Sequence, residues 1–211
     1  MAPGTDPSPD YPDDLDAAIT LTDGTICRVR PIRPDDAAAL VAFHQGLSLH
    51  STYLRFFTVH PTLTATEVHH FTTVDYRNRL ALVVESDGKL LAVGRYDRAE
   101  GDAEAEVAFV VADAYQGHGL GSLLLDELAR AGRCRGIHEF VAQTLFENKD
   151  MLDVFHHSGF QVSSTIDCGV VWLRFGIGMT PAYRAIWHDR ERRLDLRRLP
   201  ADVSLEEVRP C

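Results

Sequence analysis

The sequence predicts an α+β fold in which a mixed, mostly antiparallel central sheet carries helices on both faces. Extended segments joined by Asp-Gly turns recur along the chain, and this arrangement is typical of antiparallel hairpins. Between them, residues 103–145 have the pattern of a strand, a helix and a strand, which normally forms a parallel crossover. Hydrophobic residues make up 45% of the 211 residues and charged residues 25%, as in an ordinary globular domain.

The first third of the chain predicts a β-hairpin followed by three helices. The hairpin is centred on the turn Asp23-Gly24 within an alternating stretch. Pro34, followed by acidic residues, predicts the start of the first helix, and the capping-box pattern of Thr64 and Glu67 predicts the start of the third. The expected ranges are 18–32 for the hairpin and 33–47, 48–57 and 64–75 for the helices.

The rest of the chain completes the sheet. The turn Asp87-Gly88 joins two strands, and a glycine-containing turn at 167–169 joins the last two. Gly136 and Gly159 are expected to end the two helices of this part. The expected strands are 79–86, 89–100, 103–112, 137–145, 160–166 and 169–177, and the expected helices are 121–136 and 148–159.

We expect one domain with a tail at each end. Residues 1–16 are rich in Pro, Gly and Asp and predict a disordered arm. The folded domain is expected over 17–178. Residues 179–211 are a charge-dense tail that begins as a helix. The sequence leaves open whether this tail packs through Trp187 and Leu194, covers the site, or is disordered.

Composition argues against several classes of function. The net charge of −10 argues against nucleic-acid binding. No apolar run reaches the roughly 18 residues of a membrane span, and no signal-peptide pattern occurs. Four scattered cysteines without a CxxC pair fit a reduced cytoplasm. We therefore expect a cytoplasmic monomer or homodimer with no membrane or nucleic-acid partner. Adjacent histidines diverge by about 100° on a helix, so the pairs at 69–70 and 156–157 predict no metal site.

A glycine-rich stretch, Gln-Gly-His-Gly-Leu-Gly at 116–121, lies directly between a predicted strand and a predicted helix. Backbone amides at a helix N-terminus bind phosphate, and glycines let the backbone approach such a ligand. The stretch is not a Walker A loop, because no Gly-Lys-Ser/Thr follows, and its GxGxG spacing differs from the Rossmann GxGxxG. The residues alone leave two interpretations open, a plain turn or a phosphate cradle.

The strand before this stretch carries Glu106, ten residues upstream of Gln116. Strand alternation places Glu106 on one face with Ala108 and Val110. We expect this carboxylate to be half-buried among apolar neighbours, with its pKa raised toward a value useful for a general base. The alternative is that Glu106 is the solvated start of the strand.

The motif at 116–121 resembles the Q/R-x-x-G-x-G/A motif of the GNAT superfamily of acyl-CoA-dependent N-acetyltransferases, and the element order over about 25–175 is that of this family. The resemblance implies the GNAT fold, acetyl-CoA as co-substrate, and Glu106 as the general base. It places the CoA pyrophosphate on the backbone amides of 117–122 and the acetyl carbonyl and pantetheine along the preceding strand. The implied cofactor-binding residues are Val110, Val111, Gln116, Gly117, His118, Gly119, Leu120, Gly121, Ser122, Asn148 and Phe155.

One position departs from the family pattern. Many GNAT members carry a Tyr acid on the helix that begins at Asn148 here, and Phe155 stands in its place. A thiolate with a pKa near roughly 8.5 needs little help from an acid, so solvent or another residue, such as Tyr115, would supply the proton. Asn148 would bind the pantetheine arm or serve as a plain N-cap.

Residues 48–76 resemble the GNAT domain of bacterial Pat-type protein lysine acetyltransferases, with Ser-x-x-Ser-x-Tyr-x-Arg-Phe-Phe and a later Val-Asp-Tyr. This implies a lysine-bearing protein partner, such as an acyl-CoA synthetase that acetylation inactivates. Ser51 and Arg55 are the candidates for the acceptor cleft. Two alternatives stay open: the same chemistry on a small amine or aminoglycoside, and a catalytically weak acyl-CoA-binding regulatory module.

Overall fold

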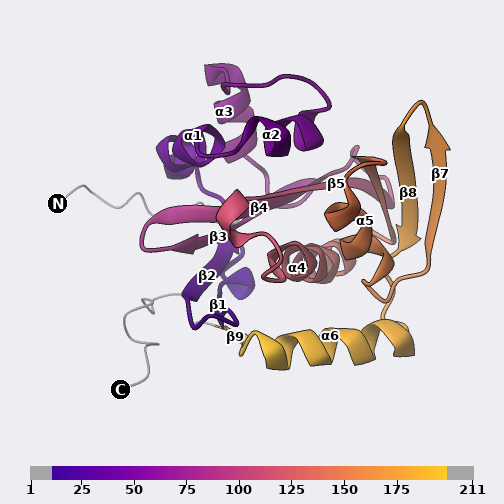
Figure 1. Ribbon diagram of the computed structural model, residues 1–211. Helices are drawn as coiled ribbons and strands as arrows, with labels where there is room; N and C mark the ends of the chain where they lie inside the picture. The colour runs from indigo at the N-terminus through magenta and orange to yellow at the C-terminus, as the bar shows by residue number, and fades with distance from the viewer. Residues whose placement is uncertain (1–10, 199–211) are drawn as a thin grey trace.

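The computed structural model describes residues 11–198, which form one nine-stranded sheet with helices on both faces (Figure 1). The strand order is β7-β8-β6-β5-β4-β3-β2-β1-β9. The strands are β1 (Ala17–Thr20), β2 (Ile26–Pro31), β3 (Arg79–Ser86), β4 (Lys89–Asp97), β5 (Glu104–Val111), β6 (Glu139–Leu145), β7 (Val162–Asp167), β8 (Val170–Gly176) and β9 (Arg197–Arg198). The helices are α1 (Ala37–Gln45), α2 (Leu49–Phe56), α3 (Ala65–Thr72), α4 (Leu120–Cys134), α5 (Lys149–His156) and α6 (Pro181–Arg193).

The pairing of the strands confirms the predicted mixed, mostly antiparallel sheet. Within residues 11–198, β5 and β6 pair in parallel and every other neighbouring pair is antiparallel. Helix α4 makes the crossover between β5 and β6. The predicted capping box of Thr64 and Glu67 begins α3. Within the described part of the chain, no helix is both long and apolar enough to cross a membrane.

Strand alternation divides β5 between two cores. Val107 and Phe109 pack in the core that includes Leu124 of α4, whereas Val110 packs on the other face with residues of α1 and α3. Gly94 of β4 lies beneath α4, where an added Cβ would be 2.9 Å from Phe109 Cδ1 and 3.1 Å from Leu124 Cβ. The missing side chain therefore allows α4 to lie close to the sheet.

Strands β5 and β6 begin as neighbours and then diverge. Their parallel ladder covers Glu104–Glu106 of β5 and Glu139–Val141 of β6. Beyond it, β5 continues to Val111 along β4, and β6 continues to Leu145 along β8. The sheet therefore opens past Glu106, on the side toward the glycine-rich loop.

The predicted disorder of residues 1–16 is wrong for residues 11–16. Tyr11 is buried, and its hydroxyl donates a hydrogen bond to the Pro31 carbonyl at 3.1 Å. Asp16 is also buried and accepts a hydrogen bond from Arg28 Nε at 2.8 Å. These contacts make the segment part of the domain. Residues 1–10 and 199–211 lie outside the described residues, so the prediction is not tested there.

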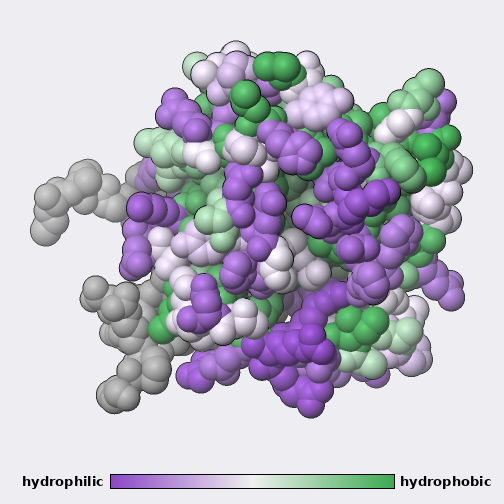
Figure 2. All heavy atoms as spheres, viewed as in Figure 1, coloured by the Kyte–Doolittle hydropathy of each residue, from purple (hydrophilic) through white to green (hydrophobic). Residues whose placement is uncertain are grey.

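Helix α6 and strand β9 also pack into the domain, so the predicted boundary at residue 178 is too early. Tyr183 is fully buried and stacks on Phe160 with the ring centroids 4.2 Å apart. Leu194 is buried and Trp187 packs against the same core, so this part of the tail takes the first of the three expected arrangements. Hydrophilic side chains cover the outer side of α6 (Figure 2). Strand β9 pairs with β1 at the edge of the sheet.

A buried ion pair joins α6 to α4. Arg190 Nη1 lies 3.0 Å from a carboxylate oxygen of Asp126, which is 2% exposed. Burial raises the pKa of Asp126 to about 6, although Arg190 acts in the opposite direction. Because this folded-state pKa lies above the ordinary value, the carboxyl stabilises the fold at low pH, and that contribution is lost as the pH rises through about 6.

We expect Arg190→Met to lower the free energy of unfolding at pH 7 by about 3 kcal/mol, because it leaves a buried carboxylate without its cation. The loss should shrink at pH 5, where Asp126 is protonated and needs no partner. Urea unfolding at the two pH values measures both effects. Arg192→Met is the matched control, because Arg192 is exposed on the same helix and should cost less than about 1 kcal/mol. Equal losses in both variants would contradict the prediction.

Candidate active site

The loop between β5 and α4 has two glycines in the left-handed region, Gly117 (φ 77°) and Gly119 (φ 83°). Gly119 is the N-cap of α4, and at both glycines nothing lies within 4 Å of the position of an added Cβ. The first turn of α4 therefore begins beside open space. Its N–H groups have no partner within the helix, and such a helix start favours an anionic group.

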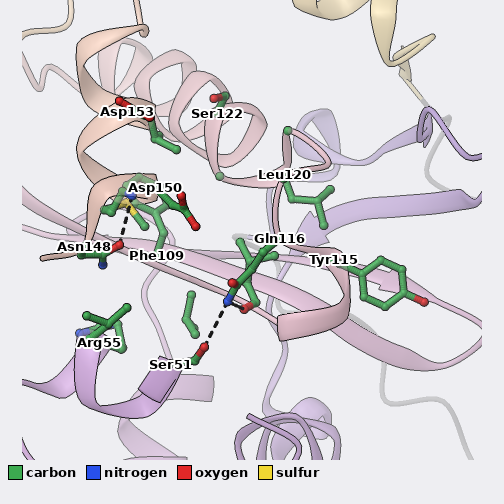
Figure 3. A pocket seen from close by; sticks show the side chains of 18 of the residues that line it. Ser51, Arg55, Phe109, Tyr115, Gln116, Leu120, Ser122, Asn148, Asp150 and Asp153 are labelled. Atoms are coloured by element: carbon green, nitrogen blue, oxygen red, sulfur yellow. Dashed lines mark hydrogen bonds between the residues drawn. The ribbon is translucent and has the colours of Figure 1, made fainter. Parts of the chain in front are cut away.

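This loop borders a pocket of about 570 Å³, called the main pocket below (Figure 3). Helices α2 and α5 complete its walls. The pocket brings together most of the residues predicted from the sequence, namely Ser51, Arg55, Val110, Val111, Gln116, Gly117, Gly119, Leu120, Gly121, Ser122 and Asn148. It also contains Leu54, Met151 and Val154, which the sequence analysis missed. In sequence, apolar residues on a helix look like core positions, and nothing distinguishes these three.

Two residues of the predicted cofactor set do not line the main pocket. His118 Nδ1 lies 3.0 Å from the Gln116 carbonyl oxygen, and its ring does not border the pocket. Phe155 is 1% exposed and packs with its ring centroid 5.6 Å from Phe175 and 6.1 Å from Phe109. Phe155 is therefore a core residue with no group that could donate a proton.

A cluster of hydrogen bonds connects the start of α2 to the loop after β5. The Asp113 carboxylate accepts hydrogen bonds from Ser48 N–H at 2.9 Å, Ser48 Oγ at 2.6 Å and Ser51 Oγ at 2.8 Å. The side-chain amide of Gln116 donates to Ser51 Oγ at 3.1 Å and to the Val111 carbonyl at 3.2 Å. Ser51 and Gln116 therefore hold α2 against the loop, in addition to lining the pocket.

Asp113 is the centre of this cluster, and the sequence analysis did not single it out. Burial would raise the pKa of Asp113, but the hydrogen bonds from Ser48 and Ser51 outweigh it and lower the pKa below its usual value. The carboxylate thus stays ionised at neutral pH. Its partners lie 62 and 65 residues away in the sequence, so no local pattern reveals the cluster.

A second cavity, of about 270 Å³, lies where β5 and β6 diverge and is called the Glu106 cavity below. It is lined by Glu106 and Ala108 of β5, by Gln143 of β6, and by residues of α2 and α5. Glu106 is exposed rather than half-buried as expected, and it lies at the last residue pair of the β5/β6 ladder, where the two strands diverge. Within residues 11–198, the side chain of Glu106 makes no hydrogen bond or ion pair, so its carboxylate borders the cavity without a partner.

Asn148 and Arg55 lie at one end of the main pocket, and Tyr115 lies at the other (Figure 3). Asn148 is the N-cap of α5, since its Oδ1 accepts a hydrogen bond from Met151 N–H at 3.2 Å, and it borders both cavities. Both interpretations of Asn148 are therefore compatible with its position. Among residues 11–198, no group of three or more His, Cys, Asp or Glu side chains could hold a metal ion.

The two ends of the site differ in their chemistry. At one end, the start of α4 and its glycines suit a phosphorylated group. At the other, Glu106 offers a carboxylate that can accept a proton. The two cavities adjoin, since they share lining residues from α2, β5 and α5. An extended anionic ligand in the main pocket can therefore bring a reactive end to a second molecule beside Glu106.

Comparison with known proteins agrees with this geometry. Residues 40–160 match the acetyltransferase (GNAT) family. Acetyltransferase Pat of Mycolicibacterium smegmatis is 30% identical over 154 residues, covering 72% of this chain and 43% of the relative. The crystal structure of the GNAT domain of S. lividans PAT is 41% identical, with a TM-score of 0.75, and covers 79% of this chain and 99% of that domain. The structure of yncA from Salmonella typhimurium with its cofactor acetyl-CoA has a TM-score of 0.59 over 74% of this chain and 96% of that one.

These matches differ in what they support. The chain spans less than half of the length of the M. smegmatis relative. The S. typhimurium structure, at 19% identity, supports the fold alone. The family match covers more than half of the chain, and the S. lividans domain aligns over nearly its whole length. The chain therefore belongs to the GNAT acetyltransferase family.

Proposed function

We propose that this protein is an acetyl-CoA-dependent protein lysine N-acetyltransferase that acetylates, and so inactivates, an acyl-CoA synthetase. The observation that carries the proposal is that the main pocket adjoins the Glu106 cavity, so that a helix start suited to phosphate and an unpaired carboxylate border neighbouring cavities. The likeness to acetyltransferase Pat and to the S. lividans PAT domain supports a lysine-bearing protein as the acceptor.

The helix start at the main pocket suits the pyrophosphate of acetyl-CoA, and the carboxylates of Asp150 and Asp153 also line this pocket. The backbone amides from Gly117 to Ser122 would hold the pyrophosphate, because two left-handed glycines leave that backbone uncovered. The pantetheine arm would follow Val110 and Val111 of β5, with Asn148 on the opposite wall. The thioester would then lie toward the divergence of β5 and β6.

Glu106 would act as the general base. A lysine amine has a pKa near roughly 10.4, so it must lose a proton before it can attack the thioester carbonyl. Glu106 takes this proton, directly or through a water molecule. The neutral nitrogen forms a bond to the acetyl carbon, and the carbon–sulfur bond breaks so that its electron pair stays on the CoA sulfur. Transfer is direct and needs no acetylated enzyme.

The acceptor is tested by measuring CoA thiol release from acetyl-CoA with a panel of acyl-CoA synthetases and small amines. We expect turnover with a synthetase, together with loss of the activity of that synthetase. Turnover with amines alone would instead indicate a small-amine or aminoglycoside acetyltransferase. Tight CoA binding without turnover on any acceptor would indicate a regulatory acyl-CoA-binding module.

We expect Glu106→Gln to lower kcat/KM by roughly 10²- to 10⁴-fold at neutral pH, because the variant cannot remove the amine proton. The affinity for acetyl-CoA, measured by calorimetry, should not change. Glu104→Gln is the matched control: Glu104 lies two residues earlier on the same strand face, where it pairs with Arg174. Acetylation by Glu106→Gln at the wild-type rate would rule out the assigned base.

We expect Gly119→Asp to weaken acetyl-CoA binding by about tenfold or more, because it places a carboxylate at the helix start that would bind phosphate. Gly101→Asp controls for backbone strain, since Gly101 also has a left-handed φ, of 84°, with no neighbour near an added Cβ, and borders none of the cavities described. Both variants should lose similar stability, roughly 1 to 2 kcal/mol. Calorimetry measures the affinity, and equal affinities in the two variants would count against the phosphate cradle.

A further inference from the structure

The junction of the two cavities contains one charged side chain. Five residues line both the main pocket and the Glu106 cavity, namely Leu54, Arg55, Phe109, Asn148 and Met151. If the proposed function holds, the thioester must lie at this junction, because the acetyl group passes there from CoA to the amine beside Glu106. Arg55 is therefore the cation at the place where the carbon–sulfur bond breaks.

Arg55 is half-buried and lacks a carboxylate partner. The carbon of its guanidinium lies 5.1 Å from the centre of the Phe56 ring, and within residues 11–198 the guanidinium makes no hydrogen bond or ion pair. Burial lowers the pKa of Arg55, and the charge of Glu106 opposes this in part. A guanidinium nevertheless stays protonated in proteins, so the site carries a positive charge that contacts no carboxylate directly, and Glu106 and Asp97 act on it only from a distance. Such a charge costs free energy unless a bound anion accompanies it.

The reaction produces an anion at this position. When the amine nitrogen bonds to the acetyl carbon and the carbon–sulfur bond breaks, the electron pair of that bond leaves with the CoA sulfur as a thiolate. The amine proton goes to Glu106 and not to the sulfur. Phe155, the core residue at the position of the usual Tyr acid, has no proton to give. Tyr115 lies at the far end of the main pocket (Figure 3).

We propose that Arg55 is a catalytic residue that stabilises the departing CoA thiolate by its positive charge, in place of protonation by an acid. The thiolate leaves as an ion pair with Arg55 and takes a proton from solvent after release. A preorganised charge in a partly dry site can stabilise a leaving group without donating a proton. The hydrogen-bond cluster around Asp113 helps to fix the helix that carries Arg55.

The test measures the pKa of the thiol of CoA bound to the enzyme, from the ultraviolet absorbance of its thiolate during a pH titration. In the wild-type protein we expect this pKa to lie at least about one unit below that of free CoA, a tenfold larger ratio of thiolate to thiol. Arg55→Gln should return the pKa to the value of free CoA. Arg55→Lys, which keeps the charge, should retain part of the shift.

Arg77→Gln is the matched control, because it removes the same charge from an exposed residue that borders none of the cavities. It should leave the pKa of the bound thiol as in the wild type. The affinity for desulfo-CoA, which has no thiol, should be the same in wild type and Arg55→Gln. An equal loss of affinity for CoA and desulfo-CoA in Arg55→Gln would overturn the proposal in favour of cofactor positioning.

A bound thiol with the pKa of free CoA in the wild type would also overturn it, whatever the variants do. Failure of the protein to bind CoA at all would instead reject the proposed function from which the inference starts. The titration needs no acceptor, so an error in the identity of the acceptor does not affect it.

Discussion

The parallel ladder between β5 and β6 ends after three residue pairs, at Glu106 and Val141, and the site is organised around that ending. Backbone hydrogen bonds normally continue a sheet to the ends of its strands, so an early divergence needs other contacts to support each strand. Here β4 supports β5 as far as Val111, and β8 supports β6 as far as Leu145. The gap between β5 and β6 therefore stays open because each of these strands is hydrogen-bonded to its other neighbour.

Elements whose local sequence contains its own turn or cap could be predicted from sequence. The Asp-Gly hairpins, the capping box at Thr64 and the alternating strands all depend on contacts within a few residues. The glycine-rich loop was also predictable, because left-handed backbone at Gly117 and Gly119 needs that residue type. A phosphate cradle could then be inferred from its place between a strand and a helix.

Features that depend on contacts between distant segments could not be predicted in this way. Tyr11 is buried against β2 although it lies in a polar, Pro-rich segment, and Tyr183 is buried within a charged helix. The cavity beside Glu106 depends on where β5 and β6 diverge, which no pattern within β5 records. The role of Asp113 depends on two serines more than sixty residues away, and so does the position of α2 above the pocket.

Substitution of Gly94 is expected to disturb the main pocket although Gly94 does not line it. The residue borders none of the cavities described, yet an added methyl group would meet Phe109 on β5 and Leu124 on α4 at the same time. Because the sheet and α4 are tightly packed, a local clash cannot be relieved by moving one atom. The extra volume would therefore displace α4 as a whole away from the sheet. The amides of its first turn would move with it. The geometry of the loop proposed to bind phosphate therefore depends on Gly94 of the neighbouring strand, whose contribution is the absence of a side chain.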